Sequence, residues 1–152
     1  MTETQLAPNM PKWMVDHVDR YLKSGGTDGH MYTIKLPNLP EREVPSLLLT
    51  TVGRKSGKKY LFPLFYGRAG KSYYIVASKG GAPDHPGWYK NLLAHPEVKT
   101  QVWDKVIPVR ARTATAAEKQ RLWPIMTALW PGYNDYQAGT KRDIPVVVLT
   151  PR

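Results

Sequence analysis

The 152-residue chain contains no cysteine, so it forms no disulfide bond and offers no thiolate for catalysis or metal binding. It also lacks any run of about 18 apolar residues, the length that a membrane-spanning helix needs. Residues 1–11 have neither the basic start nor the apolar stretch of a signal peptide. We therefore expect a cytoplasmic protein that neither spans a membrane nor is exported by that route.

Several catalytic and metal-binding patterns are missing as well. The histidines at positions 17, 30, 85 and 95 show no His-x-x-x-His spacing, and without cysteine a zinc site has little support. We expect no metal. The chain has no Gly-x-Ser-x-Gly elbow, Walker loop or Gly-x-Gly-x-x-Gly fingerprint, which argues against hydrolases and nucleotide triphosphatases.

Acidic residues are scarce. The chain has 12 Asp and Glu against 22 Lys and Arg, which gives a formal net charge of +10. Such a balance favours an acidic partner: nucleic acid, an anionic membrane surface or a polyanionic small molecule. Composition does not choose among these three.

The remaining composition is that of a folded protein. With 41% hydrophobic and 11% aromatic residues, we expect residues 1–152 to form one globular domain. A helical pattern covers residues 11–24 and ends at Gly25-Gly26. The apolar face of this variable N-terminal helix either packs on the core or rests on a membrane surface or ligand. That face comprises Trp13, Met14, His17, Val18, Tyr21 and Leu22.

The rest of the chain reads as a mainly β fold with inserted helices, an α+β architecture. β-prone runs separated by turn residues predict a small barrel of antiparallel strands. The expected strands are 47–52, 60–66, 72–78, 98–103, 106–112 and 144–150. Residues 27–45 are expected to be irregular because Pro37, Pro40 and Pro45 interrupt them.

Two or three helices are expected between these strands. A short one is predicted around residues 88–93. Another follows Thr115, which forms a capping-box pattern with Glu118. Pro124 and Pro131 are expected to kink or divide this second helix.

The turn Gly53–Lys59 is the first candidate site. It carries Arg54, Lys55, Lys58 and Lys59 with no acidic residue, although like charges this close repel each other. Its glycines allow backbone N–H groups to approach an anion, and Ser56 adds a hydroxyl donor. The turn is interpreted either as an anion-binding loop or as a solvated hairpin tip.

Two further segments carry candidate residues. The first is Ala77-Ser78-Lys79-Gly80-Gly81, which lies where a strand is expected to end. It is followed by Trp88, which offers a planar surface, and by Asn91, whose amide can both donate and accept a hydrogen bond. That set suits a flat heteroaromatic ring, although it also has ordinary turn composition. Trp130, Tyr133 and Tyr136 fall at helical spacing and form either core or a half-exposed lid.

These residues together resemble a known family. The segment at 48–57 (Leu-Leu-Thr-Thr-Val-Gly-Arg-Lys-Ser-Gly) is similar to the deazaflavin-dependent nitroreductases, split β-barrel oxidoreductases of actinobacteria. Further matches are 77–81, 86–92 (Pro-Gly-Trp-Tyr-Lys-Asn-Leu) and 133–137 (Tyr-Asn-Asp-Tyr-Gln). The resemblance runs in order from about Pro45 to the end of the chain.

The resemblance implies coenzyme F420, whose tail bears a phosphate and several carboxylates. Arg54, Lys55 and Ser56 would then face the phosphate, with Lys58 and Lys59 near the acidic tail. The deazaflavin ring would be lined by Pro63, Ala77, Ser78, Lys79, Trp88 and Asn91. FMN is the alternative cofactor, because an FMN-dependent split barrel would share the fold.

The implied reaction is hydride transfer from reduced F420 to a quinone, an enone or a nitro compound. Tyr133 and Tyr136 would border the substrate pocket with Phe65 and Trp130, which replace two tyrosines of the nitroimidazole-activating relative. Ser78 or a pocket tyrosine would stabilise or protonate the developing anion. Two other hypotheses stay open: a basic nucleic-acid-binding barrel and a non-catalytic cofactor carrier.

Overall fold

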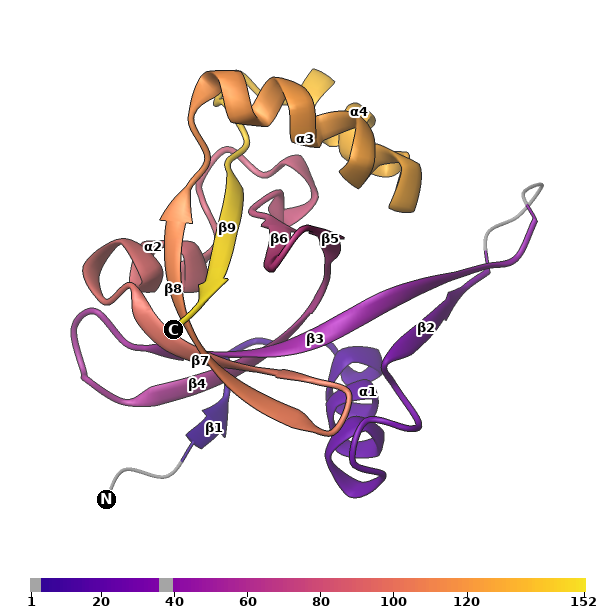
Figure 1. The fold of residues 1–152 in the computed structure, drawn as a ribbon, viewed down its shortest axis with the longest axis vertical. Coiled ribbons are helices and arrows are strands. Elements are labelled where there is room, and N and C mark those ends of the chain that lie inside the picture. Colours follow the sequence, from indigo (N-terminus) through magenta and orange to yellow (C-terminus); the bar gives the residue numbers. More distant parts are fainter. Residues whose placement is uncertain (1–3, 36–39) are drawn as a thin grey trace.

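The structure is a computed structural model that describes residues 4–35 and 40–152 (Figure 1). Nine strands occur in this part of the chain, and four α-helices and one short 3₁₀ turn connect them. The strands are β1 (Thr4–Leu6), β2 (Met31–Ile34), β3 (Arg42–Val52), β4 (Lys59–Phe65), β5 (Gly67–Ala69), β6 (Ser72–Val76), β7 (Glu97–Val102), β8 (Lys105–Thr113) and β9 (Val146–Pro151). The helices are α1 (Lys12–Lys23), α2 (Gly87–Ala94), α3 (Ala116–Leu129) and α4 (Gly132–Ala138), with the 3₁₀ turn η1 at Lys79–Gly81.

The strands form one continuous path in the order β1-β4-β3-β7-β8-β9-β6-β5, and β2 pairs with β3 beside this path. All pairs are antiparallel except β1 with β4. β4 and β6 approach each other without pairing in the described part of the chain. The sheet therefore curls into a barrel that is open between these two strands.

β9 shows why the sequence folds in layers. Val147 and Leu149 belong to the core inside the barrel, whereas Val146 and Val148 belong to a second core beneath α3 and α4. Successive side chains of a strand point to opposite faces, so this strand is buried on both sides. That burial explains its uninterrupted apolar run. Figure 1 shows α3 and α4 together over one end of the sheet.

α1 confirms the helix predicted at 11–24, but its buried face is narrower than expected. His17, Val18 and Tyr21 are buried, whereas Trp13 and Leu22 are 47% and 50% exposed. The Tyr21 hydroxyl donates to Ser46 O at 3.0 Å and accepts from Trp103 N at 2.8 Å. Burial raises the pKa of this hydroxyl to about 12. Tyr21 therefore joins α1 to the barrel.

The prediction that residues 27–45 are irregular was wrong. β2 pairs with the first part of β3, from Met31 opposite Pro45 to Ile34 opposite Arg42. Pro45 is tolerated within β3 although it lacks an N–H group. This two-stranded arm projects from the barrel in Figure 1. Pro37, which was part of the prediction, lies in 36–39, outside the described residues.

Six strands were predicted, and the additional ones are β1, β2 and β5. Each has only three or four residues, too few for an alternating pattern to stand out. β5 lies between the expected strands 60–66 and 72–78, where no strand was predicted. The two longer hairpins, the strand over 72–78 and the last strand are confirmed within a few residues.

The capping box is confirmed: Glu118 N donates to Thr115 Oγ1 and Thr115 N donates to Glu118 Oε1. Pro124 lies inside α3, while Pro131 forms the N-cap of α4 and so divides the helical segment. None of the helices in the described segments has the length and apolar character required to cross a membrane.

Candidate active site

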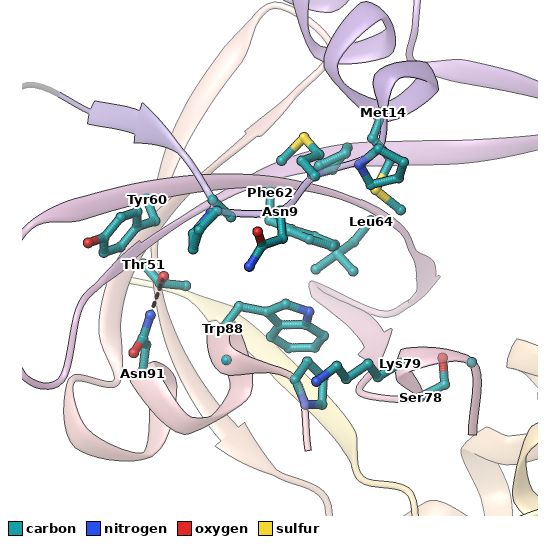
Figure 2. Close-up of a pocket in the computed structure, with 18 of the residues that line it drawn as sticks. Asn9, Met14, Thr51, Tyr60, Phe62, Leu64, Ser78, Lys79, Trp88 and Asn91 are labelled. Atoms are coloured by element: carbon teal, nitrogen blue, oxygen red, sulfur yellow. Dashed lines mark hydrogen bonds between the residues drawn. The ribbon is translucent and has the colours of Figure 1, made fainter. Parts of the chain in front are cut away.

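A cavity of about 850 Å³ opens beside β4 (Figure 2). Residues from four parts of the chain line it: residues 7–11 with α1, the hairpin of β3 and β4 with its basic turn, the segment from the end of β6 to α2, and residues 130–136. Because these parts are distant in sequence, only the folded chain brings them together.

Most of the residues predicted from the sequence line this one cavity. They are Arg54, Lys55, Ser56, Pro63, Phe65, Ser78, Lys79, Trp88, Asn91, Trp130, Tyr133 and Tyr136. Lys58, Lys59 and Ala77 do not line it. Lys58 and Lys59 are exposed beside the basic turn, whereas Ala77 is fully buried in the barrel core.

Arg54 is held in place by a residue of α2. Its backbone N–H and its Nη1 donate to Asn91 Oδ1 at 3.2 and 2.9 Å. Asn91 Nδ2 in turn donates to Thr51 Oγ1 at 3.2 Å, as Figure 2 shows. Asn91 is only 6% exposed. Asn91 therefore anchors the Arg54 guanidinium to the cavity wall. The remaining N–H donors of this guanidinium stay available for an oxyanion.

The backbone of the basic turn is closely packed. Gly53 N donates to Lys58 O at 2.7 Å, and Lys58 N donates to Ser56 Oγ at 3.2 Å. A Cβ at Gly53 would lie 2.7 Å from Ser56 Oγ and 2.9 Å from Tyr60 Cε2. A side chain at this position would therefore displace Ser56 and Tyr60. The Ser56 hydroxyl accepts from Lys58 N and also lies 3.5 Å from the Tyr60 hydroxyl, where either oxygen can donate.

The middle of the cavity offers a flat surface. Figure 2 shows the Trp88 indole there, with Asn9 on one side and Lys79 on the other. Trp88 is 7% exposed and belongs to the barrel core through its packing. A rigid, buried indole beside an exposed lysine suits a planar ligand that carries polar edges.

Sequence reasoning missed Arg142, which holds the loop that carries Ser78 and Lys79. Its Nε donates to Ala82 O at 2.8 Å, and its Nη1 and Nη2 donate to Ala77 O at 3.2 Å and Ser78 O at 2.6 Å. Nη1 also lies 3.0 Å from His85 Nδ1, which must accept because arginine only donates. Burial and then the Arg142 charge lower the pKa of His85.

Aromatic side chains close the other end of the cavity. The Tyr133 and Tyr136 rings are 6.2 Å apart, and Trp130 Nε1 donates to the Tyr136 hydroxyl at 3.3 Å. Tyr133 is 6% exposed, and burial raises its pKa well above the ordinary value of tyrosine. Its hydroxyl is thus a poor acid. Gly81 packs against α4, where a Cβ would lie 2.9 Å from Tyr136 O.

Further lining residues carried no signal that sequence reasoning could use. The segment from Ala7 to Pro11 forms a wall because β1 pairs in parallel with β4, a contact between residues more than fifty positions apart. α1 and the sheet add side chains of ordinary core type. These are Met14, His17, Ser46, Thr51, Phe62 and Leu64.

Three kinds of surface line one cavity. Arg54 bonds to Asn91, which lies on one side of the Trp88 indole in Figure 2, whereas the aromatic helix α4 packs against η1, which carries Lys79 on the other side. Within the described residues, no group of three or more acidic or histidine side chains could hold a metal ion. The geometry thus fits an elongated ligand with an anionic tail and a planar head.

Comparison with known proteins gives the same family as the resemblance. A model described as F420H(2)-dependent quinone reductase matches residues 13–151. The F420H(2)-dependent quinone reductase Rv1261c of Mycobacterium tuberculosis (strain ATCC 25618 / H37Rv) is 42% identical over 135 residues, covering 87% of this chain and 85% of that protein.

Solved structures agree with this fold. The F420-H2 dependent reductase FDR-A is 43% identical and has a TM-score of 0.64, over 69% of this chain and 93% of that one. A structure described as a domain-swapped dimer is 38% identical with a TM-score of 0.66, over 90% of this chain and 96% of that one. The expected α+β split-barrel fold is confirmed.

Proposed function

The chain belongs to the F420H(2)-dependent quinone reductase family, and on this premise we propose that it reduces quinones with electrons from reduced F420. The observation that carries the proposal is the anchored Arg54 at one end of a cavity whose other end is aromatic. When bound, F420 supplies the hydride. The protein binds and orients the two reactants and keeps water away.

The residues present fit this cofactor. Arg54, Lys55 and Ser56 would hold the phosphate, because a fixed guanidinium, an ammonium and a hydroxyl all line the cavity wall. Lys58 and Lys59 lie outside the lining and would meet only the more distant carboxylates of the tail. The backbone N–H groups of Gly53, Arg54 and Lys58 already have partners within the protein, so the side chains of the turn, rather than these amides, would meet the phosphate.

The planar head would lie against Trp88 and Pro63, with Asn91, Ser78 and Lys79 at its edges. Ala77 supports this wall from the core rather than touching the cavity. Arg142 fixes the carbonyls of Ala77 and Ser78, so the Ser78 hydroxyl is carried by a restrained backbone. These roles are proposals for the named side chains.

We propose a quinone as the acceptor in preference to an enone or a nitro compound. Trp130 and Phe65 add apolar planes beside Tyr133 and Tyr136, which favour a flat apolar ring system. The Tyr136 hydroxyl already accepts from Trp130 and can donate its proton to an acceptor oxygen. Ser78 and Tyr136 are therefore the proposed groups that orient the acceptor near the cofactor.

The loss of reduced F420 absorbance upon addition of menadione tests the proposal. We expect fast oxidation with menadione and slower oxidation with cyclohexenone or a nitroimidazole. Reduced FMN in the same assay should give little turnover, because its single phosphate cannot occupy the whole cationic end. If no acceptor caused oxidation of reduced F420, the proposed reductase activity would be refuted. Tight, salt-sensitive binding of oligonucleotides would instead favour a nucleic-acid-binding barrel.

We also propose that the cavity mouth contacts an anionic membrane surface, where lipid-soluble quinones reside. Trp13 lines the cavity yet is 47% exposed, and Lys12 beside it is exposed as well. An interfacial helix combines such an aromatic anchor with cations. Trp13→Ala should reduce sedimentation with anionic vesicles several-fold. Trp103→Ala is the matched control, because Trp103 is 48% exposed but does not line the cavity; equal losses in both variants would contradict the proposal.

A further inference from the structure

His17 lies on the cavity wall at the end where the acceptor is proposed to bind. Its Nε2 is 3.2 Å from Ser46 Oγ, and Ser46 is the cross-strand partner of Phe65. The Tyr32 ring lies between His17 and Phe65, with its centroid 4.8 Å from that of His17 and 5.9 Å from that of Phe65. The basic turn begins six pairs further along these strands, after Val52 opposite Lys59, about 20 Å away.

The hydrogen bonds of His17 determine its tautomer. Nε2 lies 2.7 Å from Gly29 O, and a carbonyl oxygen only accepts, so Nε2 carries a proton. Ser46 Oγ donates its own proton to the same carbonyl at 2.6 Å. His17 therefore gains or loses its second proton at Nδ1 alone.

Nδ1 of His17 is not sealed in the core. Among the described residues, Nδ1 of His30 is the sole fully buried side-chain nitrogen or oxygen without a hydrogen-bond partner. No described residue bonds to Nδ1 of His17, which is therefore reached by solvent. Because the His17 ring is otherwise 2% exposed and lines the cavity, the cavity is the route to this atom.

The charges around His17 are few. Arg20 on α1 lowers its pKa, Asp28 in the following loop raises it, and the neighbouring rings are Tyr21 and Tyr32. Burial has the largest effect and lowers the pKa of His17 below its usual value of 6.5. The imidazolium is thus a stronger acid than an ordinary histidine, whereas Tyr133 is a weaker acid than an ordinary tyrosine.

We propose that His17 is the proton donor to the acceptor, a role that rests on the proposed quinone reductase function. A quinone that receives a hydride gains two electrons and one hydrogen and becomes a hydroquinone monoanion. The Nδ1–H bond of the His17 imidazolium then breaks and an O–H bond forms on that anion, leaving neutral imidazole and hydroquinone. Solvent that enters the cavity returns a proton to Nδ1 after release of the product.

His17→Gln separates this role from packing. The glutamine side-chain N–H₂ reaches the position of Nε2 and can still donate to Gly29 O, but it has no titratable group. For wild-type protein, kcat/KM for menadione should rise as the pH falls through the pKa of His17, because only the imidazolium donates. In His17→Gln this rise should be absent, with kcat/KM lower by about 10²-fold at pH values below the pKa of His17 and the gap closing above it.

His95→Gln is the matched control, because His95 is exposed and does not line the cavity. It should keep the wild-type pH profile. A wild-type profile in His17→Gln, with menadione reduction intact, would overturn the role of His17 and leave the proposed function standing. Failure of wild-type protein to oxidise reduced F420 would instead refute the proposed function.

A second measurement does not depend on turnover. Protein with oxidised F420 cannot react with menadione, so the imidazole NMR signals of the four histidines can be titrated with and without this quinone. The His17 signal is the one absent from His17→Gln. A quinone oxygen that accepts from Nδ1–H stabilises the imidazolium, so menadione should raise the pKa of His17 alone. If menadione shifted the Trp130 indole signal but left the pKa of His17 unchanged, the proposal would be overturned. If menadione shifted no signal of the protein, quinone binding itself would be refuted.

Discussion

Replacing Arg54 with alanine is expected to weaken F420 binding by about 10- to 100-fold, the cost of a lost charged hydrogen bond of about 1.5–3 kcal/mol. Arg54 is the cation of the basic turn that Asn91 holds against the cavity wall. Its side chain is therefore already ordered before the ligand arrives, and little conformational entropy is lost on binding. Fluorescence titration of F420 at fixed ionic strength measures the effect.

The other cations of the turn provide the comparison. Lys58 and Lys59 are exposed and do not line the cavity, so alanine at either should cost only about 0.2–1 kcal/mol of binding free energy. That small cost should shrink further in high salt, since exposed charges are screened. Lys71→Ala removes the same charge from the exposed β5–β6 turn and should have no effect. Equal losses for Arg54→Ala and Lys71→Ala would show that net charge alone determines binding.

Local sequence patterns predicted those parts of the fold that local physics determines. The hairpin of β3 and β4 follows from two β-prone runs around glycines, and the start of α3 follows from the Thr115–Glu118 capping box. β2 was not predicted because Pro45 on its partner strand, with Pro37 and Pro40 just before that strand, suggested a loop. A proline interrupts a strand only where the backbone N–H group that it lacks would have donated to a neighbouring strand. Whether such a neighbour exists depends on the tertiary fold.

The candidate site was predictable where ligand chemistry requires unusual composition. A turn with four cations and no acid is such a case, and so are Trp130, Tyr133 and Tyr136 at helical spacing. The sequence could not show that Arg54 and Asn91, each expected to face the cofactor, contact each other. Their pairing depends on the placement of α2 beside β3, which tertiary packing determines.

Residues whose roles depend on backbone carbonyls were the least predictable. His17 and Arg142 stand in ordinary contexts, one on an amphipathic helix and the other among exposed charges. Arg142 acts through Ala77 O and Ser78 O, and the tautomer of His17 is set by Gly29 O. A carbonyl is present at every position, so such a partner leaves no trace in the sequence.

Arg142→Ala is expected to disorder the loop from Ala77 to His85 and to reduce F420 affinity by about 10²-fold, although Arg142 does not line the cavity. The guanidinium donates to three carbonyls of this loop through three different nitrogens. Charged donors to buried carbonyls are worth about 1.5–3 kcal/mol each, and hydration of the freed loop recovers part of the sum. We expect the free energy of unfolding to fall by about 2–3 kcal/mol, lowering Tm by about 5–10 °C.

Arg142→Lys sharpens this prediction because it keeps the charge. One ammonium cannot replace Nε, Nη1 and Nη2, which reach three carbonyls at separate positions, so the lysine variant should resemble the alanine variant. Lys141→Ala, the exposed neighbour, is the control for charge loss. Hydrogen exchange of residues 77–85 should accelerate in both Arg142 variants and stay unchanged in the control. Wild-type protection of this loop in Arg142→Lys would mean that charge, and not the arrangement of donors, orders the wall that carries Ser78 and Lys79.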